Sequence, residues 1–215
     1  MKLMIAIPCM DMMHVRSAEA IYNLRKPDNT DVVFLPGSLI YDSRNLLSLR
    51  AMQENYDYVL WVDSDMICHP GSLMTLLDDM NTHNTRMISG LYVKRKIPSE
   101  PVIYERVREP ITDKDGHIVR DIHAYTNYPK DDVFNVEGCG FGFVLTDTSL
   151  LKNVWDKFGP AFSPFPWAGE DISFCYRVNL LGDQIMCDSR VRLGHVGSMI
   201  YTDQFLNHGG DANEK

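Results

Sequence analysis

The sequence predicts a single α/β domain with a mostly parallel central sheet and helices on both faces. Strand-like and helix-like segments alternate through the first half of the 215 residues, which is the order of a parallel sheet. The apolar run YVLWV, residues 58–62, ends in the carboxylates Asp63 and Asp65, as expected where a buried strand leaves its sheet. A hydrophobic content of 45% and a charged content of 23% are those of an ordinary globular protein.

In the first half, apolar runs predict buried strands, and segments with apolar residues at helical spacing predict helices. Ser43 can cap one of these helices, and Pro70 can open another. The expected elements are strand 2–9, helix 16–25, strand 31–35, helix 43–55, strand 57–63, helix 70–81 and strand 86–93.

The pattern changes after residue 97. Residues 98–136 are charged and rich in turns, and their extended pieces on either side of 113–116 predict a hairpin. The remaining expected elements are strand 141–146, helix 148–158, an aromatic, Pro-rich loop 159–169, helix 170–181, and strands 184–187 and 191–196. We therefore expect one domain over residues 1–205, with a first half (1–97) of nucleotide-binding type and an irregular second half (98–205), and then a polar tail, 206–215.

Charge and cysteine content disfavour several classes of protein. The net charge of −8 argues against sequence-independent binding along a nucleic-acid backbone, although Lys94, Arg95 and Lys96 form a small basic cluster. The five cysteines are scattered and odd in number, which favours reduced thiols over disulfides or a zinc site. No apolar run reaches the roughly 18 to 20 residues of a membrane span, and the first strand does not have the pattern of a signal peptide. We expect a soluble, cytoplasmic protein without membrane insertion.

Asp63 and Asp65 are the first candidate ligand site. Ligands of open α/β sheets bind at the carboxyl ends of strands, and two carboxylates there can hold a divalent cation that in turn holds a diphosphate. The alternative is an ordinary Asp/Ser turn after a strand. The first glycine is Gly37, so a G-x-G-x-x-G fingerprint and a P-loop are excluded after the first strand. A metal ion is the expected substitute for a glycine cradle.

Glu170 and Asp171 follow Gly169 at the predicted start of a helix. One interpretation is structural, because acids in a first turn interact favourably with the exposed N–H groups and the helix dipole. The other is a general base, because a helix N-terminus keeps a carboxylate ionised and able to accept a proton at neutral pH.

His195 lies between glycines at the end of the last predicted strand. A lone histidine is more often structural, but flanking glycines indicate close approach to the backbone, and an imidazole added to two aspartates fits Mn²⁺. The alternating glycines around Gly140 predict either a flexible lead-in to a strand or a backbone surface for a sugar ring or diphosphate.

Two further features have two interpretations each. Arg44 either faces the phosphate region or begins an amphipathic helix. Phe165 and Trp167 either stack on a sugar face or fill the core.

Taken in order, five motifs resemble those of the GT-A nucleotide-sugar glycosyltransferases, in particular the family-2-like group of small bacterial and bacteriophage enzymes. The motifs are DSD (63–65), SGLYVKR (89–95), EGCGFGFVLTD (137–147), GEDISFCYRV (169–178) and LGHVG (193–197). The resemblance covers about residues 1–200. It implies the GT-A fold and transfer of a sugar from a nucleotide-diphosphate donor, commonly a UDP-sugar, to a hydroxyl acceptor with inversion. The second half would then be the acceptor and catalytic half.

The resemblance also implies a metal site for Mn²⁺ or Mg²⁺ built from Asp63, Asp65 and His195. Asp65 would bind the ion that bridges the two phosphates, His195 would complete its shell, and Asp63 would contact the ribose or a metal-bound water. Asp171 would be the catalytic base, with Glu170 orienting the acceptor or sharing that role.

The implied nucleotide-sugar pocket adds Pro8, Arg44, Ser64 and Gly140. Candidate acceptors are a glycan, a protein side chain, a metabolite or a hydroxylated pyrimidine in phage DNA, and the lack of a membrane segment argues against a lipid-linked one. One rival is a nucleotidyltransferase, although residues 10–14, MDMMH, replace the Gly-rich basic loop of such enzymes. The other rival is a non-catalytic module that binds a nucleotide sugar.

Overall fold

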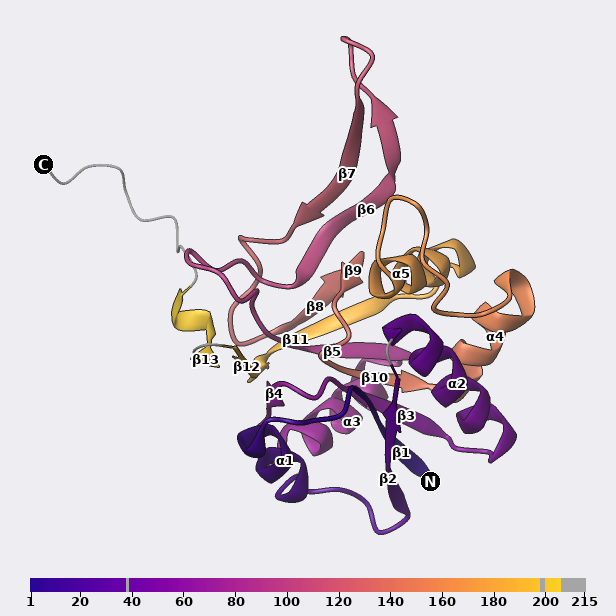
Figure 1. Cartoon of the computed structure of the whole chain (residues 1–215), viewed down its shortest axis with the longest axis vertical. Coiled ribbons are helices and arrows are strands. Elements are labelled where there is room, and N and C mark those ends of the chain that lie inside the picture. The colour runs from indigo at the N-terminus through magenta and orange to yellow at the C-terminus, as the bar shows by residue number, and fades with distance from the viewer. Residues whose placement is uncertain (38, 198–199, 206–215) are drawn as a thin grey trace, which may run out of the picture.

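The computed structural model describes residues 1–37, 39–197 and 200–205, so the polar tail expected over 206–215 lies outside the described residues. Its centre is a seven-stranded sheet with the order β2-β1-β3-β10-β5-β11-β8 (Figure 1). The strands of this sheet are β1 (Leu3–Cys9), β2 (Thr30–Pro36), β3 (Tyr58–Val62), β5 (Met87–Leu91), β8 (Val133–Val136), β10 (Phe143–Asp147) and β11 (Ile185–Arg192).

Five of these strands run in one direction, and β10 and β8 run against them. β1 pairs in parallel with β2 and β3, β5 pairs in parallel with β11, and β10 lies antiparallel between β3 and β5. The predicted mostly parallel sheet is confirmed. The strands of the first half are not all neighbours in this sheet, because β10 enters between β3 and β5 from the second half. Its apolar sequence suits a central position but does not encode a direction.

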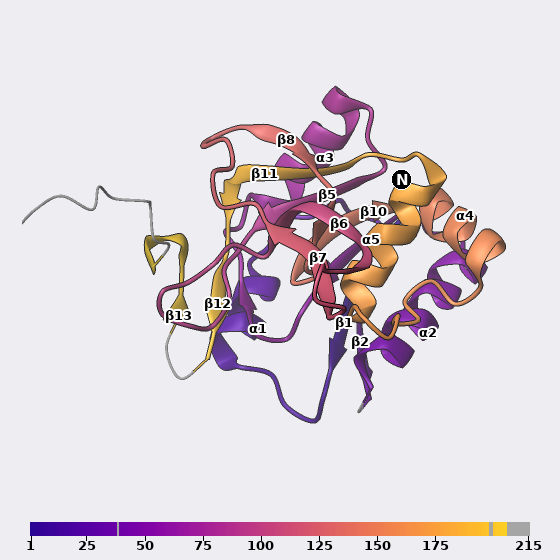
Figure 2. The same ribbon diagram turned by 90° about the horizontal axis from the view of Figure 1, so that it is seen from above.

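The helices cover both faces of the sheet, as predicted. α1 (Val15–Tyr22) and α3 (Ser72–His83) pack on one face. α2 (Ile40–Gln53), α4 (Thr148–Phe158) and α5 (Glu170–Leu181) pack on the other, where α4 and α5 lie side by side (Figure 2). The helices expected at 148–158 and 170–181 are confirmed at those bounds. Among the described residues, none of the helices combines the length and apolar character needed to cross a membrane.

The predicted cap of the second helix is wrong. α2 begins at Ile40 with Leu39 as its N-cap, and Ser43 is buried inside the helix. A Cβ added at Gly37 would lie 2.6 Å from the Ser43 hydroxyl oxygen, so Ser43 packs closely against the preceding loop. Tertiary packing therefore overrides the local preference of serine for a cap.

The two late strands predicted at 184–187 and 191–196 are in fact one long strand, β11, followed by the short β12 (Gly194–Val196). The polar residues between them do not end β11, because their charges are paired. Arg190 Nε lies 2.9 Å from the buried Asp188 carboxylate, and Arg190 Nη2 lies 2.7 Å from Asp79 on α3.

Two small sheets complete the fold. One contains β4 (Met66–Ile67), β12 and β13 (Ile200–Tyr201), and the other contains β6 (Ile103–Thr112), β7 (Ile118–Ala124) and β9 (Gly138–Cys139). β6 and β7 form the predicted hairpin, which extends away from the main sheet (Figure 1). The pairing of β12 with β4 places His195 opposite Met66, and Val196 N donates to Asp65 O at 2.8 Å. This pairing brings the last predicted motif to the acidic turn after β3.

Candidate active site

The acidic turn after β3 forms one wall of a cavity at the carboxyl ends of β1 and β3. The cavity has a volume of about 250 Å³, and its lining includes Pro8, Asp63, Ser64 and Asp65 together with residues of the loop before α2 and of α2 itself. Asp63 N donates to Gly142 O at 3.1 Å, which ties the turn to the lead-in of β10. Four of the six predicted nucleotide-sugar residues are therefore brought together here. The other two, Arg44 and Gly140, lie outside the cavity lining.

Arg44 lies behind this cavity and joins the two halves of the chain. Its side chain is only 3% exposed, and its Nη2 lies 2.7 Å from Asp63 Oδ1 while Nη1 donates to Glu170 Oε1. The guanidinium group also lies over the Phe141 ring, 5.3 Å from its centroid. Both terminal nitrogens are thus engaged by carboxylates, one from the turn after β3 and one from the first turn of α5.

Asp171 is a partly buried carboxyl group with a strongly altered acidity. Burial raises its pKa to about 6, the Glu170 carboxylate adds to the rise, and Arg44 opposes it. The Ile172 backbone N–H donates to Asp171 Oδ1 at 2.7 Å. The position at a helix start alone predicted a carboxylate that is ionised at neutral pH. Burial makes Asp171 a stronger base that is still largely ionised at neutral pH.

Asp63 shares the electrostatic environment of Asp171. Burial raises the pKa of Asp63 above its usual value, and the neighbouring carboxylates of Asp65 and Glu170 add to a rise that Arg44 opposes. The site therefore concentrates several carboxyl groups around one buried guanidinium group.

Asp65 faces a different set of partners. Its Oδ2 lies 3.5 Å from His195 Nε2 and 2.9 Å from Arg95 Nη1. Burial opposes the ionisation of Asp65, but the His195 contact and the charge of Arg95 hold its pKa below the usual value. Of the three predicted metal ligands, the structure brings Asp65 and His195 together, whereas Asp63 turns toward Arg44.

The chemistry of the Asp65–His195 pair fits a divalent cation. His195 Nδ1 lies 2.8 Å from Val93 O, and a carbonyl can only accept, so Nδ1 donates. Nε2 is then the nitrogen whose lone pair a cation would bind after loss of any proton it shares with Asp65. A histidine oriented by a carbonyl in this way is a common metal ligand, and imidazole with carboxylate suits Mn²⁺. No group of three or more His, Cys, Asp or Glu side chains positioned to hold a metal occurs within the described ranges. The protein itself thus offers two ligands at this place.

Tyr92, at the end of β5, is the residue that the sequence analysis missed. It is buried, its hydroxyl oxygen accepts from Gly142 N at 3.3 Å, and its ring meets the His195 ring edge-on at 5.4 Å. Burial raises its pKa well above the usual value, and the charges of Asp63 and Asp171 add to the rise. Its position just after a parallel strand was the available signal.

Tyr92 also accounts for Gly140. A Cβ added at Gly140 would lie 2.0 Å from the Tyr92 hydroxyl oxygen. The close approach expected from the glycine run is therefore made by a tyrosine of the protein, and Gly140 itself is buried.

Phe165 and Trp167 pack outside the main core. Their rings stack on each other with centroids 5.2 Å apart, and each meets the Tyr176 ring edge-on. Both are partly exposed and pack against Tyr176 of α5.

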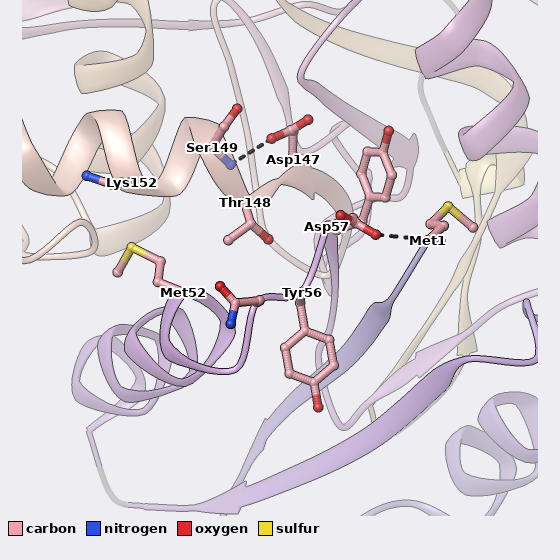
Figure 3. Close-up of a pocket in the computed structure, with 10 residues that line it drawn as sticks. Met1, Met52, Tyr56, Asp57, Asp147, Thr148, Ser149 and Lys152 are labelled. Atoms are coloured by element: carbon pink, nitrogen blue, oxygen red, sulfur yellow. Dashed lines mark hydrogen bonds and ion pairs between the residues drawn. The ribbon is translucent and has the colours of Figure 1, made fainter.

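A larger cavity lies elsewhere, at the opposite end of β3 (Figure 3). Its volume is about 660 Å³, and it lies between the last turn of α2 and the start of α4. Asp57 and Asp147 contribute to its lining, but the motifs after β3, at the start of α5 and in β12 all lie away from it. We therefore place the candidate active site at the smaller cavity, where the partly buried carboxyl groups gather.

Comparisons with known proteins give structural matches only. No protein-family model matches the sequence, and a search of the curated proteins finds no match. The crystal structure of A197 from STIV aligns with a TM-score of 0.65 at 17% identity, over 92% of this chain and 86% of that chain. The crystal structure of GalNAc-T7 with UDP, GalNAc and Mn²⁺ aligns with a TM-score of 0.58 at 9% identity, over 91% of this chain and 44% of that chain. The sheet, the helices on its two faces and these likenesses together show that the chain has the GT-A fold.

Proposed function

We propose that the protein is a metal-dependent glycosyltransferase that moves a sugar from a nucleotide-diphosphate donor, most simply a UDP-sugar, to a hydroxyl acceptor. The observation that carries the proposal is the gathering of carboxyl groups at the carboxyl end of the central sheet: Asp63 and Asp171 lie near the buried Arg44, and Asp65 lies next to Asp63. The GalNAc-T7 structure that shares this fold contains UDP, GalNAc and Mn²⁺, which supports the same class of donor for this chain.

The donor would enter the cavity lined by Pro8, Ser64 and Asp65. A cavity of about 250 Å³ is smaller than most complete ligand sites, so it would take the nucleoside part and leave the diphosphate near Asp65. Asp63, at the same wall, would contact the ribose.

The cation would be held by Asp65 and His195, with diphosphate oxygens completing its shell. When bound, Mn²⁺ or Mg²⁺ supplies positive charge that offsets the charge developing on the departing diphosphate. The Val93 carbonyl, which accepts from His195 Nδ1, orients the imidazole for this role.

Asp171 would act as the base. Its carboxylate accepts the proton of the acceptor hydroxyl while the oxygen attacks the anomeric carbon and the bond to the diphosphate breaks. One displacement of this kind inverts the configuration. Glu170 is bound to Arg44, so its part would be to fix the first turn of α5 and thereby the direction of Asp171.

The acceptor would lie on the α5 side of the site. The rings of Phe165 and Trp167 beside α5 offer a surface on which a sugar face can stack. Tyr104 of β6 also lies near Asp171: burial raises the pKa of Tyr104 to about 12, and the charge of Asp171 adds to this rise. A glycan, a protein side chain, a metabolite or a hydroxylated base all present the hydroxyl that Asp171 requires.

A screen of nucleotide sugars with Mn²⁺ or Mg²⁺ tests the proposal, scored by the slow hydrolysis of the donor. We expect one donor to be hydrolysed with release of its nucleoside diphosphate. We expect the Asp171→Asn variant to bind the same donor without hydrolysing it. Release of pyrophosphate would identify a nucleotidyltransferase instead. Binding of a nucleotide sugar with no turnover over hours would identify a non-catalytic module.

A further inference from the structure

The basic turn after β5 divides its three charges unequally. Lys94 Nζ lies 2.9 Å from Glu100, and Lys96 Nζ lies 2.5 Å from the same carboxylate. Arg95, between them, turns the other way and donates to Asp65 Oδ2 at 2.9 Å and to Val196 O at 3.3 Å. The turn is therefore not a diffuse positive patch. One acid neutralises two of its cations, and the third is directed into the candidate active site.

The turn is internally braced in this arrangement. Ser99 Oγ donates to Lys96 O at 2.6 Å, and Lys94 N donates to Glu100 O at 2.9 Å. The Arg95 side chain is 50% exposed and is held outside its own turn by two contacts. It can leave those contacts without disturbing the backbone that carries it.

Arg95 occupies the side of Asp65 that a metal ion would use. The same oxygen, Oδ2, faces both Arg95 Nη1 and His195 Nε2. A divalent cation held by Asp65 and His195 would lie next to the Arg95 guanidinium group. Two positive groups that share one carboxylate oxygen repel each other strongly. A bound cation and the present position of Arg95 are therefore in competition.

The Arg95 side chain, once displaced from Asp65, could bind the diphosphate of the donor. A diphosphate near Asp65 brings several negative oxygens within reach of the same side chain, and a planar guanidinium group binds phosphate oxygens in pairs. Arg44 cannot take this part, because it is buried and bound by Asp63 and Glu170. Of the three basic residues of the turn, Arg95 is the one whose side chain points to Asp65.

We propose that Arg95 is a donor-binding residue that serves as the internal counter-ion of Asp65 in the free protein and moves to the diphosphate when a metal ion displaces it. The inference rests on the proposed function, because it assigns the diphosphate of that donor to a residue of this chain. The inference predicts that one substitution of Arg95 raises the affinity for the metal ion and lowers the affinity for the diphosphate. Removing Arg95 removes a competitor of the metal and also removes a ligand of the diphosphate.

The test measures two affinities of the free protein, that for Mn²⁺ alone and that for inorganic pyrophosphate at saturating Mn²⁺, both by titration calorimetry. We expect Arg95→Gln to bind Mn²⁺ several-fold more tightly and pyrophosphate about tenfold more weakly, as for the loss of one hydrogen-bonded charge. Arg95→Lys keeps the charge without the planar fork, so it should restore the competition with Mn²⁺ but only part of the pyrophosphate affinity.

Lys96→Gln is the matched control, because it removes one charge from the same turn at a residue bound to Glu100. It should leave both affinities within about twofold of the original protein, since exposed pairs contribute little. Circular dichroism checks that all variants are folded.

The outcomes separate this inference from the proposed function. If the original protein binds Mn²⁺ and pyrophosphate while Arg95→Gln weakens both, or behaves like Lys96→Gln, the role of Arg95 is refuted and the glycosyltransferase proposal stands. If the original protein binds neither Mn²⁺ nor pyrophosphate, both proposals are refuted.

Discussion

Arg44 Nη2 lies 2.7 Å from Asp63 Oδ1, and the opposite nitrogen of the same guanidinium group binds Glu170, which is 126 residues away in the chain. One buried cation thus joins the turn that would receive the donor to the helix that carries the proposed base. The placement of Asp171 relative to Asp63 depends on this bridge.

We expect Arg44→Met to lower the free energy of unfolding by about 3 kcal/mol, because removal of the buried guanidinium group leaves two partly buried carboxylates unpaired. Urea denaturation at pH 7.5 measures this change. Arg50→Met is the control, since Arg50 makes an exposed pair with Glu54 on the same helix and should cost less than about 1 kcal/mol. Equal losses for the two variants would show that Arg44 is not a bridge of structural importance.

The raised pKa of Asp171 predicts a stability that depends on pH. A carboxyl group whose folded pKa is raised from 3.8 to about 6 stabilises the fold below pH 4 and loses that contribution as the pH rises through 6. The shift corresponds to about 3 kcal/mol at most. Asp171→Asn removes the ionisation and should therefore become progressively more stable than the original protein between pH 4 and pH 7. Urea denaturation across this range measures the difference, and a constant difference would contradict a raised pKa.

The same pKa predicts the pH dependence of turnover. A base must be deprotonated, so the rate of donor hydrolysis or transfer should rise with pH through about 6 and then level off. Glu170→Gln removes a charge that raises the Asp171 pKa, so the midpoint of the rate profile should move to lower pH. A profile that keeps its midpoint in Glu170→Gln, or moves upward, would argue against Asp171 as the titrating base.

Loss of the proposed metal ligands and loss of the proposed base should affect different steps of the reaction. A chelator should abolish turnover of the original protein, and added Mn²⁺ should restore it. Asp65→Ala should have no turnover even with added Mn²⁺. Asp171→Asn should retain nucleotide binding, because its proposed role lies in the chemical step. Calorimetric titration with UDP and Mn²⁺ measures this division, and equal weakening of nucleotide affinity in both variants would refute it.

The local pattern of the sequence was sufficient for much of the fold. The helices at 148–158 and 170–181 and the hairpin around 113–116 are confirmed, because periodicity, caps and turns depend on residues that are close in the chain. The strand expected at 57–63 is likewise confirmed, with the slightly shorter bounds Tyr58–Val62. Its apolar residues followed by carboxylates predict that the acidic turn lies at the carboxyl end of a buried strand.

The partners of the charged residues were decided only by the tertiary structure. The sequence shows a basic cluster at 94–96, but not that Glu100 binds Lys94 and Lys96 while Arg95 reaches Asp65. It shows Arg44 at a helix start, but not its burial. It shows an apolar strand after Gly142, but not that β10 runs antiparallel between β3 and β5. Each of these depends on which distant segments meet and on how much water they exclude, and neither quantity is contained in a local pattern of residues.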